Sequence, residues 1–274
     1  MGLPYAEVIG DPIAHSKSPQ IHKFWLEKLG IEGDYRATRV AADGLGDYFR
    51  SRMADSDWRG CNISMPHKLA ARAYAYHRQD PSFPPWPINL AYRDPEGRLI
   101  GEEFDSAGFI MSMLKLRGES GGPRSALILG AGSAARLVAW GLAHFGSAPI
   151  WIRNRDEQKA RTLAGDYLKV GVRVLPPRAA TPPVDILINA TPLGMAGMPE
   201  AEIDLKPLPD HALVYDLVYD PPETALLRQA RARGLRAVNG LSMLIEQAVP
   251  SFHRLFGAMP PRADDDALLA LLTS

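Results

Sequence analysis

The chain has 274 residues, a length that suits roughly two domains, each with its own hydrophobic core. Hydrophobic residues make up 46% and charged residues 23% of it, which is the balance of a globular protein rather than of a disordered or membrane-embedded one. No apolar run approaches the ~20 residues of a spanning helix, and residues 1–10 lack the pattern of an export signal, so we expect a cytoplasmic protein.

Charge and metal-binding potential narrow the classes of partner. The 31 basic residues balance 31 acidic ones, so the chain lacks the broad positive field that attracts nucleic acid or anionic lipid. The single cysteine, Cys61, excludes an internal disulfide and is expected to be a small buried hydrophobe. The 7 histidines show no metal-ligand spacing. We therefore expect no metal, no nucleic acid and no membrane partner, but a small-molecule substrate bound by a monomer or homodimer.

Residues 1–104 alternate short apolar runs with helical patterns, which predicts an α/β arrangement. The expected strands are residues 6–9, 35–40 and 61–64, and the expected helices are residues 20–29 and 45–53. The turn sequence Asp94-Pro95-Glu96-Gly97 separates two more apolar runs and predicts a hairpin of residues 88–92 and 98–102.

From residue 125 onward the alternation is more regular. We expect strands at residues 126–129, 149–152, 172–175, 186–189, 213–216 and 236–238, with helical patterns in most gaps. This alternation implies a parallel sheet, since parallel neighbours need a crossover between them. Residues 107–116 are expected to form a connecting helix, and a final helix at residues 243–256 is expected to return to the first domain.

A glycine-rich turn follows the first strand of this second half. The sequence Gly130-Ala131-Gly132-Ser133-Ala134-Ala135 is G-x-G-x-x-A between a strand and a helical pattern, the setting of dinucleotide sites. Gly130 permits the tight turn, and Gly132 lets a pyrophosphate approach the backbone. The helix start adds free N–H groups and a positive dipole end. Residues 130–134 are therefore expected to bind a dinucleotide, with a merely structural turn as the alternative.

The end of the next strand bears on the choice of dinucleotide. An NAD site places an acid there to hold the ribose hydroxyls, whereas this chain has Arg153-Asn154-Arg155. Arg155 offers a planar fork suited to a 2′-phosphate, with Asn154 beside it, so we expect NADP (NADPH) and regard NAD as the less favoured cofactor. The alternative is that these arginines are only solvated. Asp156 is expected to be a helix N-cap.

The N-terminal half contains polar clusters suited to substrate binding. In His15-Ser16-Lys17-Ser18-Pro19, Ser18 is expected to be a helix N-cap and Pro19 the first helical residue. Helix starts attract anions, so Ser16 and Ser18 are candidates to hold a substrate carboxylate. An ordinary surface cap is an equally weighted alternative.

Two more clusters lie at predicted strand ends. Asn62, Ser64 and Lys68 follow an apolar strand, where sheet-based enzymes place reactive groups, although a lone lysine is usually solvated. Asn89 precedes a run that ends in Asp105, which leads into the connecting helix. For Asp105 a capping role is the plain explanation, and an acid at a domain junction facing a cofactor is the functional one.

These clusters occur in the order and at about the spacing found in shikimate dehydrogenases, and the resemblance covers essentially the whole chain. Residues 15–19 resemble the family's carboxylate-binding H-S-x-S-P, which implies that role for Ser16 and Ser18. Residues 62–68 resemble N-V-T-x-P-x-K, which implies that Lys68 is the catalytic lysine. Ser64, where threonine is usual, is then a contact to a substrate hydroxyl.

Later motifs extend the resemblance to both halves. Asn89 matches the asparagine of G-A-x-N-T, and Asp105 matches the aspartate of D-N-T-D-G. Residues 189–195 look like the N-A-T-x-x-G-M loop beside the cofactor, which implies a cofactor contact for Thr191. Residues 216–219 are similar to D-x-x-Y, which implies that Tyr219 is the active-site tyrosine.

The last motif lies near the C-terminus. Residues 240–247 resemble G-L-x-M-L-x-x-Q, which places Met243 near the nicotinamide and Gln247 on a substrate hydroxyl. The resemblance implies an N-terminal α/β substrate-binding and catalytic domain, residues 1–104 completed by residues 243–274. Residues 105–242 would form a Rossmann-type, doubly wound parallel sheet that binds NADP.

The chain departs from the family pattern around the expected pocket. Phe104 stands where D-N-T-D-G has threonine, Trp86-Pro87 replaces the small pair of G-A-x-N-T, and Leu90 replaces its threonine. A site built for hydroxyls discriminates strongly against losing a partner, so these changes bear on the substrate.

The resemblance implies an oxidoreductase that reversibly reduces the C3 ketone of 3-dehydroshikimate to shikimate with NADPH, in aromatic amino acid biosynthesis, with Lys68 and Asp105 as the catalytic pair. One alternative is a paralogue with the same chemistry on quinate, an amino-shikimate or another cyclic hydroxy acid. From a different class, the alternative is a non-catalytic NADP(H)-binding sensor.

Overall fold

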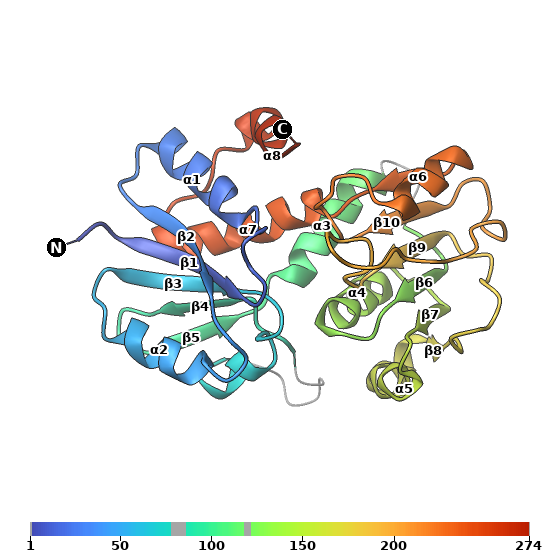
Figure 1. The fold of residues 1–274 in the computed structure, drawn as a ribbon, viewed down its shortest axis with the longest axis horizontal. Helices are drawn as coiled ribbons and strands as arrows, with labels where there is room; N and C mark the ends of the chain where they lie inside the picture. Colours follow the sequence, from blue (N-terminus) through green and yellow to red (C-terminus); the bar gives the residue numbers. More distant parts are fainter. Residues whose placement is uncertain (1, 78–85, 118–121, 274) are drawn as a thin grey trace. The chain divides into compact units, whose positions relative to one another are not determined.

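The computed structural model describes residues 2–77, 86–117 and 122–273. The chain forms two compact units, Met1–Phe104 together with Ile245–Ser274, and Asp105–Leu244. Figure 1 shows the elements of both units. In the part of the chain that the structure describes, no helix is long and apolar enough to cross a membrane.

The first unit is built on a 5-stranded mixed sheet with strand order β2-β1-β3-β4-β5. Parallel pairing joins β1, β2 and β3, and antiparallel pairing adds β4 and β5. The strands are β1 (Tyr5–Gly10), β2 (Asp34–Arg39), β3 (Trp58–Ile63), β4 (Leu90–Arg93) and β5 (Leu99–Glu102). The helical elements are α1 (Ser18–Leu29), α2 (Leu45–Met53), the 3-10 turns η1 (Ala70–Ala73) and η3 (Arg262–Asp264), most of α7 (Leu241–Phe256), and α8 (Asp265–Thr273).

Helices cover both faces of this sheet, with α1 and α2 on opposite sides (Figure 1). Successive side chains of a strand point to opposite faces of the sheet. Every residue of β1 is buried because both faces are covered. Ile9 packs into a cluster with α2, whereas Val8 packs on the other face with Leu255 of α7. A strand buried on both faces usually reads as a continuous apolar run, and in β1 Glu7 interrupts that run. The buried Glu7 carboxylate accepts hydrogen bonds from Thr38, Tyr48 and Arg52.

The expected hairpin is confirmed as β4 and β5. Its turn is closed by the Gly97 N–H, which donates to the Asp94 carbonyl at 3.0 Å, and Gly97 has a φ of +79° that favours glycine. Several strand boundaries differ from the expected ones by one or two residues, and the start of β3 differs most, because β3 begins at Trp58 and not at residue 61. Arg59 and Gly60 interrupt the apolar run: Gly60 pairs with Ala6 and Tyr92, whereas the β1–β3 register shifts past Arg59.

The second unit is built on a 6-stranded sheet in which all neighbours are parallel, with strand order β11-β10-β9-β6-β7-β8. The strands are β6 (Ala126–Leu129), β7 (Ile150–Arg153), β8 (Val172–Val174), β9 (Ile186–Asn189), β10 (Leu213–Asp216) and β11 (Arg236–Val238). The helical elements are α3 (Asp105–Arg117), α4 (Ser133–His144), α5 (Glu157–Asp166), η2 (Leu168–Val170) and α6 (Ala225–Ala232). The order is that of the Rossmann-type, doubly wound fold.

Two apolar layers sandwich this sheet. Ile128 and Ile188 belong to the cluster formed with α3, α4 and α5, whereas Leu127 and Leu187 belong to the cluster formed with α6. Within the described chain, no helix fills the crossovers at residues 175–185 and 190–212, although helices were expected in most gaps. The long β9–β10 crossover instead supplies Leu205 and Leu208 to the second cluster.

Candidate active site

The carboxyl edge of the 6-stranded sheet contains a topological switch point between β6 and β9. From β6 the chain moves outward to β7 and β8, then returns to the other side of β6 as β9. In open α/β sheets, ligands bind in the crevice outside the strand ends at such a point. Gly130 follows β6 and Ala190 follows β9, so the predicted glycine-rich turn lies at this crevice.

Gly130 is required by the protein's own packing. Its φ is +110°, and a Cβ built there would lie 2.9 Å from the Ala190 carbonyl oxygen and 3.0 Å from Cγ2 of Thr191. Its N–H donates to the Arg153 carbonyl at 2.8 Å and extends the ladder between β6 and β7. Only glycine lets the two loops approach this closely.

Gly132 plays a different part at the start of α4. Gly132 is the N-cap residue and has an extended backbone. Among the described residues, no side chain makes a capping hydrogen bond at this helix start. A Cβ built at Gly132 would meet no described heavy atom within 4 Å. Ser133 and Ala134 form the first helical turn behind it. A helix start without a side-chain cap, at a glycine whose Cβ position is open, fits the pyrophosphate of a dinucleotide.

The end of β7, which was expected to select the dinucleotide, has one exposed arginine and one arginine that is hydrogen-bonded within the protein. The Arg155 side chain is exposed, whereas Arg153 donates from its guanidinium to the Ala179 carbonyl at 2.7 Å. Asp156 is confirmed as the N-cap of α5, since its carboxylate accepts from the N–H groups of Gln158 and Lys159. The Asn154 carboxamide donates to the Asp156 carbonyl at 2.8 Å. Asp156 is thus occupied by its own helix.

The loop after β9 is tied down by the last residue of that strand. The fully buried Asn189 accepts at Oδ1 from the Thr191 N–H at 3.1 Å and from the Thr191 hydroxyl at 2.6 Å. The Thr191 hydroxyl oxygen in turn accepts from the Leu193 N–H at 3.2 Å. Thr191 therefore has a fixed position beside Gly130.

In the first unit, the predicted lysine follows the carboxyl end of β3 in a well-anchored turn. The Ser64 N–H donates to the Ile9 carbonyl at 2.8 Å, and the Ser64 carbonyl accepts from His67 at 3.0 Å. The Lys68 carbonyl accepts from the Ile88 N–H at 2.9 Å. Ser64 and Lys68 are both half-buried, as groups that meet a small ligand from solvent need to be.

The structure brings Asn89 and Gln247 together inside the first unit. Both side chains are buried, and Asn89 donates to Gln247 Oε1 at 3.1 Å. The other end of the Asn89 carboxamide accepts from the Phe104 N–H at 2.7 Å. Asn62, whose role sequence reasoning had left open, supports this pair by donating to the Asn89 carbonyl at 3.2 Å and to Ser251 at 3.0 Å.

The start of α1 differs from the expectation. The N-cap is Lys17 and not Ser18, because Lys17 has φ −83° and ψ −2° and its carbonyl accepts from the Ile21 N–H at 3.1 Å. Ser18 is the first helical residue and is buried. The Ser16 hydroxyl oxygen, one position before the N-cap, accepts from the Ser18 N–H at 3.3 Å.

The remaining predicted residues belong to the second unit. Asp105 is buried and begins α3, whereas Tyr219 and Met243 are half-buried. Tyr219 follows Val218, whose N–H donates to the Asp216 carboxylate at 3.1 Å. The described residues contain no group of three or more His, Cys, Asp or Glu side chains that could hold a metal ion.

Two of the departures from the family pattern have a structural explanation. Leu90 is fully buried in the apolar cluster of Ala6, Val8 and Tyr35, and Phe104 packs against the same cluster. Their apolar side chains therefore complete a core. The structure gives Trp86 a backbone contact, since its carbonyl accepts from Arg72 at 2.6 Å.

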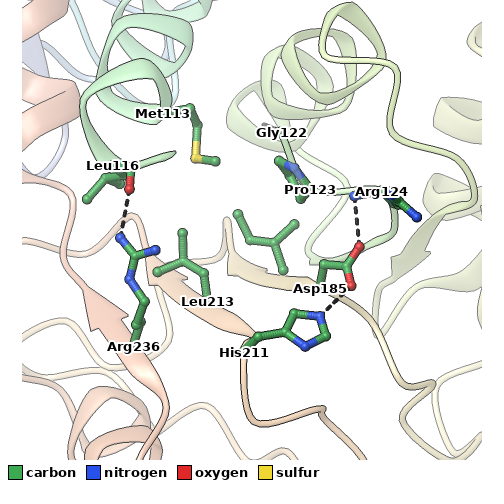
Figure 2. A pocket seen from close by; sticks show the side chains of 10 residues that line it. Met113, Leu116, Gly122, Pro123, Arg124, Asp185, His211, Leu213 and Arg236 are labelled. Atoms are coloured by element: carbon green, nitrogen blue, oxygen red, sulfur yellow. Dashed lines mark hydrogen bonds and ion pairs between the residues drawn. The ribbon is translucent and has the colours of Figure 1, made fainter. Parts of the chain in front are cut away.

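A pocket of about 600 Å³ lies elsewhere in the second unit. It opens at the amino edge of the sheet, where Ile186, Leu213 and Arg236 begin their strands (Figure 2). At its rim, Asp185 accepts from His211 at 3.0 Å and from the Arg124 N–H at 2.8 Å. Its lining includes none of the predicted site residues.

Comparison with known proteins identifies the family. Residues 8–81 match the model of the shikimate dehydrogenase substrate binding domain. A shikimate dehydrogenase (NADP(+)) from Sphingopyxis alaskensis is 50% identical over 99% of this chain and 97% of its own. The chain belongs to the shikimate dehydrogenase family. Another member, from Methylobacterium radiotolerans, is 43% identical over 95% of this chain and 94% of its own.

Solved structures of the family share the fold. Shikimate 5-dehydrogenase from Thermus thermophilus, in complex with NADP(H) and shikimate, superposes with a TM-score of 0.83 at 32% identity, covering 98% of this chain and 100% of its own. Quinate dehydrogenase from Corynebacterium glutamicum, in complex with NAD, gives a TM-score of 0.84 at 25% identity, covering 98% of this chain and 99% of its own. Members of this fold family thus differ in both substrate and dinucleotide.

Proposed function

We propose that the chain catalyses the NADP-dependent, reversible reduction of 3-dehydroshikimate to shikimate. The observation that carries the proposal is the 50% identity, over 99% of the chain, to a protein named shikimate dehydrogenase (NADP(+)). The Rossmann-type unit with an uncapped helix start at its switch point supports it independently.

The second unit binds the cofactor through the carboxyl edge of its sheet. Residues 130–134, which are Gly130, Ala131, Gly132, Ser133 and Ala134, receive the pyrophosphate at the start of α4. Arg155, with Asn154, contacts the 2′-phosphate, since Asp156 is engaged as a cap. Thr191 contacts the cofactor, and Met243 lies near the nicotinamide. When bound, NADPH supplies the hydride.

The first unit binds most of the substrate. Ser16 and Ser18 hold its carboxylate at the start of α1, where a helix dipole favours an anion. Ser64 and the Asn89–Gln247 pair contact ring hydroxyls, and the second unit contributes Tyr219. The hydrogen bond between Asn89 and Gln247 fixes both carboxamides before substrate arrives, which lowers the cost of ordering them on binding.

Lys68 and Asp105 act as the catalytic pair. During reduction, the Lys68 ammonium donates a proton to the carbonyl oxygen as negative charge develops there, and it stabilises that charge. Asp105, the second member of the pair, orients the reacting hydroxyl of the substrate. In the reverse direction Lys68 takes the proton back from the alcohol.

Shikimate is favoured over quinate as the substrate. Leu90 and Phe104 lie in a core cluster, so these departures from the family pattern alter packing and leave the polar pair Asn89–Gln247 in place. The proposal also includes a cytoplasmic location and a monomer or homodimer, which cell fractionation and sedimentation equilibrium would test.

The test of the function is NADPH oxidation with 3-dehydroshikimate, repeated with NADH, together with the reverse reaction, NADP⁺ reduction with shikimate, quinate and an amino-shikimate. We expect turnover with the first pair and a lower kcat/KM for NADH. Lys68→Ala should lower kcat by about 10²- to 10⁴-fold while leaving the Kd of NADPH unchanged. Lys28→Ala, which removes an exposed lysine paired with Asp264, is the matched control and should keep wild-type kcat. Normal kcat in Lys68→Ala would refute the catalytic assignment.

A further inference from the structure

Asn189 and Asp216 end adjacent strands at the carboxyl edge of the second unit's sheet. Both side chains are fully buried. The Asn189 carboxamide donates to Asp216 Oδ1 at 2.8 Å and to the Leu193 carbonyl at 2.9 Å, while its oxygen accepts both protons from Thr191. One carboxamide therefore holds both the beginning and the end of residues 191–193.

Asp216 extends this network to the next loop and helix. Its Oδ1 also accepts from the Val218 N–H at 3.1 Å, and its Oδ2 accepts from the Thr224 hydroxyl at 2.7 Å. Thr224 is the N-cap of α6, where its hydroxyl oxygen accepts from the Leu227 N–H at 3.3 Å. A continuous set of hydrogen bonds thus joins the start of α6 to Thr191.

Burying these two polar side chains is costly, and the core does not need them. The apolar clusters on both faces of the sheet already hold β9 and β10 in place. A buried acid loses its hydration, and apolar groups of similar volume at such positions are often as stable. Polar networks of this kind instead fix one geometry among several.

The geometry that they fix is the distance between two loops. The Ala190 carbonyl and the Thr191 methyl lie so close to Gly130 that a Cβ there would approach them to 2.9 and 3.0 Å. A displacement of the Thr191 loop by a few tenths of an ångström would therefore change the width of the crevice at the switch point.

We propose that Asn189 and Asp216 are positioning residues that set the Thr191 loop against Gly130, and that they thereby determine the affinity for NADP(H). The inference rests on the proposed function, because it takes the carboxyl edge to be the cofactor site. Neither side chain is placed in contact with the cofactor, and both act through Thr191.

The test compares two variants at opposite ends of one strand. Asn189→Ala removes the carboxamide at the carboxyl end of β9. Asp185→Ala is the matched control at the amino end, where the side chain also ties down a neighbouring segment by accepting from the backbone N–H groups of Arg124 at 2.8 Å and Ser125 at 3.0 Å. Both variants should lower Tm. Only Asn189→Ala should raise the Kd of NADPH, measured by fluorescence titration, by about tenfold or more, since small displacements weaken a preorganised site.

Steady-state kinetics provides a second readout. In Asn189→Ala the KM for NADPH should rise and the KM for 3-dehydroshikimate should stay at the wild-type value. A purely structural role would lower Tm without this split. Wild-type NADPH affinity in Asn189→Ala, or an equal loss of affinity in Asp185→Ala, would overturn the inference. Failure of wild-type protein to bind NADPH would overturn the proposed function instead.

Thr224 supplies a milder pair of variants should Asn189→Ala fail to fold. Thr224→Val removes the hydroxyl that donates to Asp216, and Thr224→Ser keeps it. We expect a weaker NADPH affinity in Thr224→Val than in Thr224→Ser. Equal affinities in these two variants would contradict the network.

Discussion

The carboxyl and amino edges of the 6-stranded sheet are formed by the same strands but organise polar groups differently. At the carboxyl edge, Gly130, Asn189 and Asp216 bring two loops into contact through buried hydrogen bonds. At the amino edge, a pocket of about 600 Å³ has an apolar floor and a rim where Asp185 contacts His211 and Arg236 donates to the Leu116 carbonyl (Figure 2). We propose the carboxyl edge as the cofactor site because fixed polar groups converge there at a switch point, whereas the amino-edge pocket contains none of the predicted site residues.

The pKa values of two carboxyl groups, Asp216 at the carboxyl edge and Asp185 at the amino edge, shift in opposite directions. Burial raises the pKa of Asp216 above its ordinary value, and hydrogen bonds from Thr224, Val218 and Asn189 offset this only in part. Burial also acts to raise the pKa of Asp185, but hydrogen bonds from His211 and two backbone N–H groups outweigh it, so that this pKa is lowered. The ionised carboxylate therefore stabilises the amino edge and is disfavoured at the carboxyl edge.

The largest effect is expected from the two glycines of the carboxyl edge. Gly130→Ala places a methyl 2.9 Å from the Ala190 carbonyl at a φ of +110°, so it should lower Tm and weaken NADPH binding by about a hundredfold. Gly132→Ala points a methyl into open space and should keep the wild-type Tm while still weakening NADPH binding. Thermal denaturation and NADPH titration of both variants would check this. Normal NADPH binding by Gly132→Ala would mean that the pyrophosphate does not approach there.

A smaller effect is expected from the exposed arginine near the same edge. Arg155→Ser should weaken NADPH binding by about tenfold, because it removes a charged hydrogen-bond donor to the 2′-phosphate. NADH binding and Tm should stay the same. Arg161→Ser, an exposed arginine of α5 paired with Glu157, is the control and should leave both affinities unchanged. An equal loss of NADPH and NADH affinity in Arg155→Ser would show that Arg155 does not select NADPH over NADH.

The smallest effect concerns acid stability at the amino edge. The folded pKa of Asp185 is lowered, so the stability from its carboxylate is present above its unfolded pKa of about 3.9 and is lost as pH falls through the folded pKa. As the pH falls below about 4, the stability of Asp185→Asn should therefore drop less than the stability of wild type. The kinetic constants of the variant at neutral pH should be unchanged. Tm measured against pH would show this as converging curves on the acid side. Parallel curves would contradict the assigned pKa shift.

The sequence predicts the local parts of this account well. The N-cap at Asp156 and the hairpin turn at Gly97 each depend on residues within a few positions of one another. The turn at Gly130 was identified by its local motif, although the residues that pack against it, Ala190 and Thr191, are distant in sequence. The cap of α1 was misjudged by one residue, because Lys17 adopts helical backbone angles despite the serine that follows it.

Contacts between distant residues were beyond sequence reasoning. Asn189 and Asp216 meet only because β9 and β10 pair in register, Asn189 opposite Asp216. Asn89 and Gln247 meet because α7 returns to the first unit. Sequence motifs included all four residues, but strand register and helix packing decide which side chains touch. A buried polar residue at the last position of an apolar strand is the signal that could have identified Asn189 and Asp216.

The most direct test of the central claim is an amide NMR titration of the wild-type protein with NADPH. The account predicts large shift changes for Gly130–Ser133 and for residues 191–193 at the carboxyl edge, and unchanged shifts for Asp185, His211 and Arg236 at the amino edge. Shift changes confined to the amino-edge pocket would contradict it.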